Sequence, residues 1–242
     1  MFQLFTDFIH RVAYATDASA YREVPQGVAY PECEDDIVEL VRVAKERGTF
    51  LIPRAGGTSI AGQVVGSGIV VDVSKFMNRI VEINPAERYA VVQPGVVLDE
   101  LNLACREYGL FFSPETSTSN RCCIGGMFGN NSCGSHSLVY GSTRDHVVEA
   151  RGVLSNGEVV TFKEEREGTS GRSPFVQSIY DQLSGFASDK DTCSLIADNY
   201  PDRSLKRRSC GYAIDEVIEG LQDDGKPLED RTINLCKLLA GS

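Results

Sequence analysis

A glycine-rich loop that follows a short apolar segment constrains this chain more than any other stretch. The segment from Thr49 to Pro53 is predicted to be a strand, and it leads into Arg54-Ala55-Gly56-Gly57-Thr58-Ser59-Ile60-Ala61-Gly62-Gln63. Glycines allow backbone angles that other residues resist, and they leave amide N–H groups uncovered. Several such N–H groups can converge on an anion such as a diphosphate. The loop therefore predicts a phosphate cradle, with an ordinary glycine-rich turn as the alternative.

The loop differs from both common phosphate-binding motifs. No Lys follows the glycines as in a P-loop, and no G-x-G-x-x-G opens a helix as in a dinucleotide fold. Backbone N–H groups and the hydroxyls of Thr58 and Ser59 are therefore the groups expected to hold an anion.

Composition excludes several classes of protein. A length of 242 residues with 42% hydrophobic content predicts a globular, soluble chain of one large domain or two small ones. A net charge of -10 disfavours a nucleic-acid partner, because its phosphates would be repelled. No window approaches the roughly 20 apolar residues of a membrane span. The N-terminus lacks the basic region of a secretory signal.

The eight cysteines show no paired C-x-x-C spacing, so neither a zinc site nor an iron-sulfur site is expected in this chain. They are predicted to be reduced thiols of a cytoplasmic protein, most of them packed as small apolar residues. No metal ligands are predicted. The adjacent Cys122 and Cys123 are expected in a loop.

Hydrophobic periodicity predicts an α/β unit around the loop. Residues 1–27 are expected to be an N-terminal arm or short helix, followed by an extended segment from Gly27 to Pro31. Apolar residues from Ile37 to Ala44 recur at helical spacing, between acidic residues on one side and Gly48 on the other. The apolar run from Ile69 to Val73 predicts another strand.

The second part of the chain is predicted to contain two hairpins and further helices. The hairpins are residues 80–83 with 89–92, and residues 147–154 with 158–162, the latter joined by Asn156-Gly157. Helices are expected at 98–108 and around 175–183, a solvated loop at 163–173 and a polar connector at 187–191. Residues 113–119 and 124–134 are predicted to be a loop that covers a ligand, with a disordered linker as the alternative.

Six segments together resemble a known family. They are Pro53-Arg54-Ala55-Gly56-Gly57-Thr58-Ser59, Val71-Asp72-Val73-Ser74 with Asn78, Gln93-Pro94-Gly95-Val96, Pro114-Glu115-Thr116-Ser117, Ile124-Gly125-Gly126 with Asn130-Asn131, and Tyr140-Gly141-Ser142-Thr143-Arg144-Asp145-His146-Val147. Their order and spacing over residues 14–163 resemble the FAD-binding module of the FAD-linked oxidases, the vanillyl-alcohol oxidase and p-cresol methylhydroxylase type. The set is most similar to the branch with D-lactate dehydrogenases and the glycolate oxidase flavin subunit.

The resemblance implies an α+β fold with FAD between two subdomains, a small sheet with helices in residues 28–78 and a larger, mainly antiparallel sheet in residues 79–242. It implies that the diphosphate meets Arg54, Ala55, Gly56, Gly57, Thr58, Ser59, Gly62 and Gln63. The phosphates, ribityl chain and flavin edge would be lined by Pro94, Gly95, Pro114, Thr116, Ser117, Gly125, Gly126, Asn130 and Asn131. Gly141, His146 and Val147 would lie near the adenine half.

Two departures from the family pattern affect these expectations. Some relatives carry a His after the paired glycines that bonds the flavin covalently, and Thr58 stands at that position here, so FAD is expected to be non-covalent. Relatives also continue beyond a sequence like Ala240-Gly241-Ser242 into a substrate domain. The chain is therefore expected to be an N-terminal module. Its expected partners are that domain and an electron acceptor or iron-sulfur module, which allows peripheral attachment to the inner membrane.

The implied chemistry is oxidation of a D-2-hydroxy acid such as D-lactate or glycolate, with hydride passing from the α-carbon to flavin N5. A base must take the hydroxyl proton, and none of His10, His136 and His146 is assigned to it. His10 is expected to be structural, and His136 either faces the flavin or stabilises its loop. Arg208, in the basic run Lys206-Arg207-Arg208, resembles a ligand of the substrate carboxylate, with a solvated basic run as the alternative.

Other functions remain open at this point. The same FAD scaffold serves relatives that reduce a UDP-N-acetylglucosamine enolpyruvate. A small-molecule binding module without redox activity and a purely structural module are the remaining alternatives.

Overall fold

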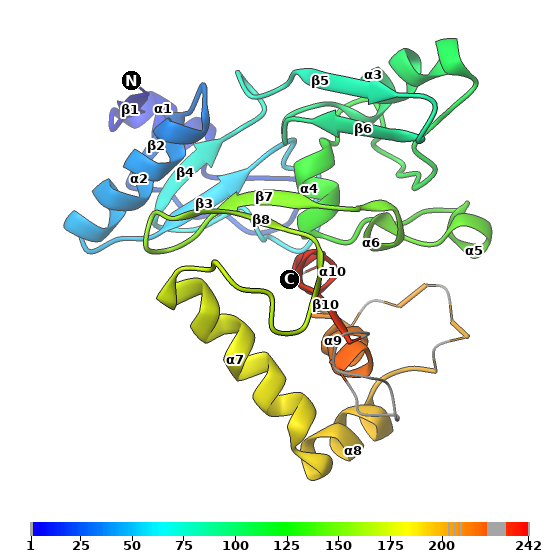
Figure 1. Cartoon of the computed structure of the whole chain (residues 1–242). Helices are drawn as coiled ribbons and strands as arrows, with labels where there is room; N and C mark the ends of the chain where they lie inside the picture. The colour runs from blue at the N-terminus through cyan, green and yellow to red at the C-terminus, as the bar shows by residue number, and fades with distance from the viewer. Residues whose placement is uncertain (1, 203, 206, 209, 222–230, 242) are drawn as a thin grey trace.

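A computed structural model describes residues 2–241 except 203, 206, 209 and 222–230 (Figure 1). The predicted α+β class is confirmed: the described residues contain one four-stranded mixed sheet, three two-stranded antiparallel sheets and helices around them. The antiparallel strands thus lie in separate pairs rather than in one continuous sheet within the described chain.

The four-stranded sheet has the order β1-β2-β4-β3. Its strands are β1 (Gln3–Phe5), β2 (Gly27–Tyr30), β3 (Leu51–Arg54) and β4 (Ile69–Asp72). Strands β2, β3 and β4 are parallel and β1 is antiparallel to β2. Every residue of β2 and β4 is buried, as expected for parallel strands that are covered on both faces. The predicted strand after Gly48 starts at Leu51 rather than Thr49, and it continues to Arg54.

One face of this sheet is covered by α2 (Glu34–Glu46), which confirms the predicted helix. Three acidic residues occupy its first turn, where they complement the helix dipole. Leu40 packs against Ala29, Ile69 and Val71 of the sheet. On the other face, Phe5 and Tyr14 of the N-terminal arm pack with Val64 against the sheet. In this arm α1 (Phe8–Ala13) follows β1.

The first predicted hairpin and the helix after it are also confirmed. The hairpin is formed by β5 (Ile80–Asn84) and β6 (Tyr89–Val92). It is followed by α3 (Leu98–Cys105) and the 3₁₀ helix η1 (Arg106–Tyr108), which ends at Gly109 with φ 67°. These elements share a core in which Val96, Leu101 and Cys105 are buried.

The prediction of a continuous loop over residues 124–134 is wrong, because α4 (Ile124–Gly129) forms there. Glycine disfavours helix, so the local sequence argues against this element. The helix is stabilised by tertiary packing, since Met127 is buried against Leu98 and Cys122. Two short helices follow, α5 (Ser137–Tyr140) and α6 (Thr143–His146).

The Asn-Gly hairpin is confirmed as β7 (Ala150–Val153) and β8 (Val159–Phe162), with Gly157 at φ 86°. Residues 163–173, predicted to be a solvated loop, include β9 (Glu164–Arg166). This prediction fails because β9 is held by β10 (Thr232–Asn234), a partner that is distant in the sequence.

The last part of the described chain is mainly helical. Its helices are α7 (Pro174–Ser188), α8 (Lys190–Asn199), α9 (Ile214–Leu221) and α10 (Leu235–Leu239). The predicted connector at 187–191 is wrong, since α7 runs longer than expected and α8 begins directly after Asp189. These helices form a second core around Tyr180, Val217 and Ile233, and α10 returns to the middle of the molecule beside α4 (Figure 1).

Candidate functional site

The first glycine loop, residues 54–63, starts where β3 ends. Arg54 pairs with Asp72 at the end of β4, so both residues lie at the same edge of the sheet. Contacts with the N-terminal arm hold the loop in place. The Arg54 guanidinium donates to the Thr16 carbonyl at 2.9 Å and stacks over the Tyr14 ring, and the Ala18 N–H donates to the Gly57 carbonyl at 3.1 Å.

A hydrogen-bonded pair at the strand end supports this arrangement. The Tyr14 hydroxyl donates to Asp72 Oδ2 at 2.5 Å, while Asp72 Oδ1 accepts from the backbone and hydroxyl of Ser74. Burial, together with the bond to Asp72, raises the pKa of the Tyr14 phenol, so it stays protonated. The pair ties the N-terminal arm to the sheet edge that carries the loop.

The loop conformation requires its glycines. Gly57 and Gly62 have φ 61° and 79°, which glycine adopts without strain, and a Cβ on Gly62 would lie 2.5 Å from the Tyr21 ring. The backbone N–H groups of Gly57, Thr58 and Ser59 donate to no acceptor in the part of the chain that the structure describes. Three consecutive donors without an acceptor there fit the predicted anion cradle.

A second glycine segment, residues 121–131, lies directly against the first loop. A Cβ on Gly56 would lie 2.3 Å from the Arg121 carbonyl oxygen, so the two backbones touch at Gly56. On the other side, a Cβ on Gly126 would lie 3.5 Å from the Ala55 Cβ. Burial raises the pKa of the Cys123 thiol to about 11, with a smaller contribution from the Cys122 thiol. Cys123 is therefore a packed, protonated thiol beneath this contact.

Pro94 and Gly95 are brought to the same place. The Gly125 N–H donates to the Pro94 carbonyl at 2.9 Å, and the Gly95 N–H donates to the Met77 carbonyl at 2.8 Å. A Cβ on Gly95 would lie 2.5 Å from the Val73 carbonyl. These close approaches fix the start of α4 beside the end of β4.

The far end of the second glycine segment is held by Arg144. The Arg144 backbone N–H donates to Asn131 Oδ1 at 2.9 Å, and Asn131 itself has φ 42°. The Arg144 side chain is buried and donates to the carbonyls of Ala240 and Gly211. Asn131 is thereby joined to the last residues of the described chain.

The hydroxyl-rich residues predicted at 113–119 form an adjoining group. Thr116 Oγ1 lies 3.1 Å from Cys122 Sγ, so it faces the second glycine segment, whereas Ser117 is exposed and Pro114 is buried. Glu115 accepts from the Ser135 hydroxyl at 2.6 Å, and its Oε2 lies 3.4 Å from His136 Nδ1.

His146 is partnered at the edge of this group. Its Nε2 lies 3.0 Å from Ser113 Oγ and 2.7 Å from the Tyr140 carbonyl. Gly141, at φ 83°, makes the turn before α6, and a Cβ there would lie 2.4 Å from Asp145 Oδ2. Val147 is partly buried and packs against the second core. His10 lies on α1, where its ring Nδ1 is 2.7 Å from Asp7.

Arg208 lies away from the glycine loops in its own ion pairs. Its guanidinium donates to Asp215 Oδ2 and, at 2.9 Å, to Glu216 Oε1 of α9. Lys206 of the same basic run, and Ser242, lie outside the described residues.

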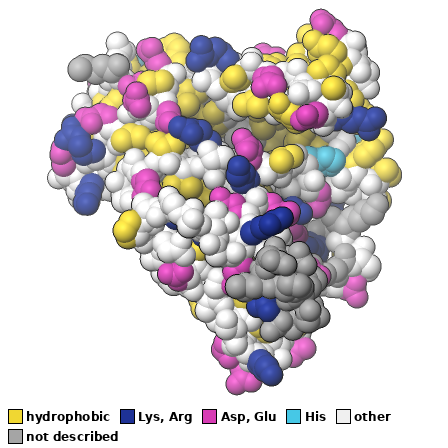
Figure 2. Space-filling view, in the orientation of Figure 1, with side chains coloured by type: hydrophobic (Ala, Val, Ile, Leu, Met, Phe, Trp, Pro, Cys, Tyr) yellow, Lys and Arg dark blue, Asp and Glu magenta, His cyan; other side chains and the backbone are white. Residues whose placement is uncertain are grey.

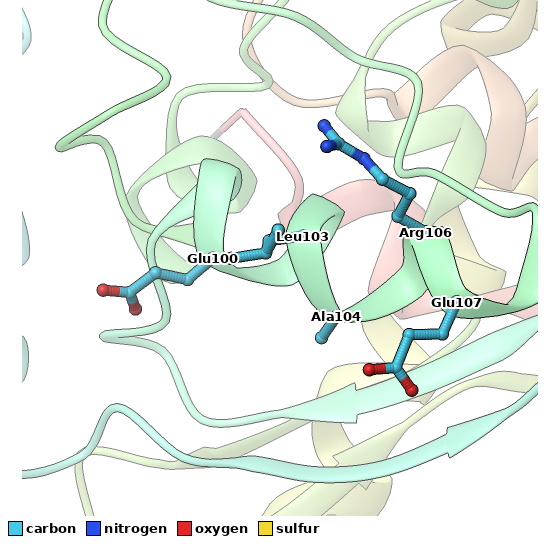
Figure 3. Close-up of a pocket in the computed structure, with 5 residues that line it drawn as sticks. All are labelled: Glu100, Leu103, Ala104, Arg106 and Glu107. Carbon is cyan, nitrogen blue, oxygen red and sulfur yellow. The ribbon is translucent and has the colours of Figure 1, made fainter.

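A shallow hollow is found elsewhere, on the outer side of α3 and η1, where Glu100, Leu103, Ala104, Arg106 and Glu107 line it (Figure 3). The two carboxylates point away from the Arg106 guanidinium, so these charges do not converge on a ligand (Figure 3). Hydrophobic side chains gather near this region in the space-filling view (Figure 2), and Val81, Leu103 and Tyr108 are exposed.

The described residues show neither a metal-binding cluster nor a membrane-spanning helix. Within them, no three His, Cys, Asp or Glu side chains are grouped as a metal site would require. None of the helices there combines the length and apolar character needed to cross a bilayer.

Sequence reasoning missed the residues that support the glycine loops. Tyr14, Arg121 and Arg144 act through contacts that the linear order of residues does not reveal. Asp72 gave a usable signal, because a single carboxylate that ends a buried apolar strand needs hydrogen-bond partners.

Comparisons with known proteins identify the family of this chain. The FAD binding domain family matches residues 25–163. The chain is 37% identical to D-2-hydroxyglutarate dehydrogenase of Escherichia coli over 98% of this chain and 23% of that protein. It is 35% identical to glycolate oxidase subunit GlcD of Bacillus subtilis over 62% of this chain and 32% of that protein. The chain thus spans about a quarter to a third of the length of these relatives.

A solved structure shows the same fold. 6-Hydroxy-D-nicotine oxidase of Arthrobacter nicotinovorans superposes with a TM-score of 0.59 at 24% identity, covering 66% of this chain and 35% of that one. Because the family match covers more than half of the residues, the chain belongs to the FAD binding domain family.

Proposed function

We propose that this chain is the cofactor-binding part of an FAD-dependent dehydrogenase that oxidises a D-2-hydroxy acid. The observation that supports this most is the contact between the two glycine segments at Gly56, beside three consecutive backbone N–H groups that have no acceptor among the described residues. A diphosphate without a metal or Lys needs such donors. The relatives named as D-2-hydroxyglutarate dehydrogenase and glycolate oxidase support the substrate class.

The proposed ligands of FAD fall into three groups. The diphosphate would be held by Arg54, Ala55, Gly56, Gly57, Thr58, Ser59, Gly62 and Gln63. The phosphates, ribityl chain and flavin edge would be lined by Pro94, Gly95, Pro114, Thr116, Ser117, Gly125, Gly126, Asn130 and Asn131. Gly141, His146 and Val147 are proposed to lie near the adenine half.

When bound, FAD would supply the acceptor for the hydride of the substrate α-carbon. The residues of this chain would bind and orient it, and they would exclude water from one side of the ring. We propose that binding is non-covalent, since Thr58 offers no imidazole.

Arg208 remains a prediction as a ligand of the substrate carboxylate. Asp215 and Glu216 already accept its hydrogen bonds, so a substrate would have to displace at least one of them. The proton-accepting base is proposed to come from a substrate domain of a longer protein. That protein would pass electrons to an acceptor or iron-sulfur module, with peripheral membrane attachment through it.

Titration of the purified chain with FAD tests the cofactor proposal. We expect a yellow protein and an increase in unfolding free energy of about 2.7 kcal/mol at a free FAD concentration of 100 times Kd. Acid precipitation should release all flavin into the supernatant if the bond is non-covalent. A colourless chain whose melting temperature is unchanged by added FAD contradicts the proposal.

Anaerobic mixing of the full-length protein with candidate reductants tests the substrate class. Bleaching of the flavin by D-2-hydroxyglutarate, D-lactate or glycolate supports a hydroxy-acid dehydrogenase. Bleaching by NADPH alone supports the alternative in which the same scaffold serves a UDP-sugar reductase. FAD binding without reduction by any of them supports the non-redox alternative.

A further inference from the structure

We propose that the hydrogen bond between Gln63 and Asn130 is a latch that holds the two glycine segments at a fixed separation, so that both side chains act in FAD binding as one unit. This inference rests on the proposed binding of FAD, and it adds positioning roles to two residues. Gln63 ends the first glycine loop, and Asn130 is the residue that directly follows α4.

The Gln63 side-chain amide uses both of its ends. Its Nε2 donates to Asn130 Oδ1 at 2.7 Å, and its Oε1 accepts from the Ser59 hydroxyl within the same loop. The amide is therefore oriented by its own loop before it reaches across to the other segment. One N–H of Gln63 remains available to an anion in the cradle.

The bond between Gln63 and Asn130 is one of two contacts between the glycine segments. At the other contact, Gly56 touches the Arg121 carbonyl, and Ala55 lies beside Gly126. The Gln63 side chain bonds to Asn130, and this pair is called the rim of the cradle. The Asn130 backbone N–H donates to the Gly126 carbonyl at 3.0 Å, one helical turn away. The stretch from Gly57 to Ser59, whose N–H groups have no acceptor among the described residues, therefore runs between these two contacts.

Each end of the latch is anchored to a different part of the molecule. The first glycine loop is seated on the N-terminal arm, through Ala18 and Tyr21. The residue after Asn130 is Asn131, which is held by the Arg144 backbone and packs against Gly241. The rim bond thus joins two independently supported segments, and its loss should leave both supports intact.

The strength of the bond between Gln63 and Asn130 depends on whether water can reach it. Gln63 and Asn130 are both exposed, so water competes for their polar atoms in the free chain. A ligand that covers the rim excludes that water and strengthens the bond. The latch should therefore contribute more to FAD affinity than to the stability of the free chain.

A double-mutant cycle on FAD binding tests the latch in the 242-residue chain. The variants are Gln63→Ala, Asn130→Ala, both together, and the swap of Gln63→Asn with Asn130→Gln, which moves the longer side chain to the other segment. Gln177→Ala is the matched control, because it removes an exposed 2.7 Å side-chain bond to Asp181 on α7, away from the glycine loops. Kd for FAD is measured by calorimetry, and thermal unfolding is measured without FAD.

We expect each single variant to weaken FAD binding roughly fivefold, which corresponds to one ordinary hydrogen bond. The double variant should be no weaker than either single one, and the swap should restore binding to within about twofold. Melting temperatures without FAD should match the wild-type chain, and Gln177→Ala should leave Kd unchanged.

Additive losses, near 25-fold in the double variant, would mean that the two side chains act on FAD binding independently of each other, and this result overturns the latch. Unchanged Kd in all variants overturns it as well. A swap that does not recover affinity, in a chain that melts normally, has the same meaning. In these three cases the wild-type chain still binds FAD, whereas a wild-type chain that binds none removes the proposed function and the latch together.

Discussion

At Gly56, a single missing side chain sets the distance between two segments that are far apart in the sequence. Any Cβ there would lie 2.3 Å from the Arg121 carbonyl oxygen, and that atom belongs to the backbone. A flexible side chain could rotate away, but a backbone carbonyl moves only if its whole segment moves. The close contact of the two glycine segments thus depends on this residue.

Replacing Gly56→Ala should separate the glycine segments. We expect a loss of about 1–3 kcal/mol in unfolding free energy, typical of overpacking, and a loss of FAD binding of at least tenfold. Urea unfolding and calorimetry measure the two effects. Gly185→Ala on α7 is the control, because a Cβ there meets nothing within 4 Å, and it should stabilise the chain by about 0.5–1 kcal/mol. Equal FAD affinities for Gly56→Ala and wild type would show that the contact is unimportant for the cofactor.

Thiol reactivity should separate the cysteines by burial. The pKa values of Cys123 and Cys236 are raised to about 11 by burial, so at pH 8 only about a thousandth of either is thiolate. Cys33 and Cys210 are exposed. Iodoacetamide labelling followed by mass spectrometry should modify the exposed pair first and the buried pair only after denaturation. Labelling of Cys123 at the rate of Cys33 would contradict the burial of the second glycine segment.

At the scale of elements, α2 and β7 are joined by an ion pair. Arg151 Nε lies 2.5 Å from Glu34 Oε2, and its second nitrogen donates to Glu34 Oε1 at 2.9 Å. This hydrogen bond from Arg151 lowers the pKa of the Glu34 carboxyl, so the folded state favours its charged form. The pair lies at the surface, where solvent screening reduces its contribution.

The pH dependence of this pair has a definite sign. Because the pKa of Glu34 is lower in the folded state, its stabilisation is present above the ordinary value of 4.5 and is lost as pH falls through the lowered value. Arg151→Ala should therefore lower the free energy of unfolding slightly at pH 7, and by much less once Glu34 is protonated. Urea unfolding at pH 7 and at a pH below the lowered pKa of Glu34 measures the difference, with Arg151→Lys as the control that keeps the charge. An equal loss at both pH values would indicate lost packing instead.

Elements with strong local signals could be predicted from the sequence, and those held by distant partners could not. The helix α2 has apolar periodicity and acidic residues at its start, and the β7-β8 hairpin has its Asn-Gly turn. By contrast, α4 contains three glycines, and β9 reads Glu-Glu-Arg. Their structures depend on Met127 packing and on pairing with β10, which local propensity does not contain.

At the scale of the whole molecule, Arg144 connects the second glycine segment to the end of the described chain. Its buried side chain donates to the carbonyls of Ala240 and Gly211, and its backbone N–H donates to Asn131. The sequence indicated the motif around Arg144 only through family resemblance, and it could not show which carbonyls the guanidinium would reach. The glycine positions of the site were thus predictable, but their supports were not.

Arg144→Ala should loosen the C-terminal part of the molecule before the first sheet. Leaving the buried Ala240 carbonyl without a donor costs about 1–3 kcal/mol, so we expect a loss of that order in unfolding free energy. Hydrogen exchange should speed up for amides of α10, while those of β2 and β4 remain protected. The exposed Arg151→Ala is the matched control. Uniform acceleration across both regions would contradict this local role.

The seat of the first glycine loop on the N-terminal arm has a consequence for how the domain is delimited. The family match begins at residue 25, yet Tyr14, Thr16, Ala18 and Tyr21 lie before it. A gene fragment cut at the family boundary would keep every glycine of the cradle, but it would lose the N-terminal arm that holds the first glycine loop. Boundaries drawn from shared sequence alone would then yield a shorter protein that has the motif without its shape.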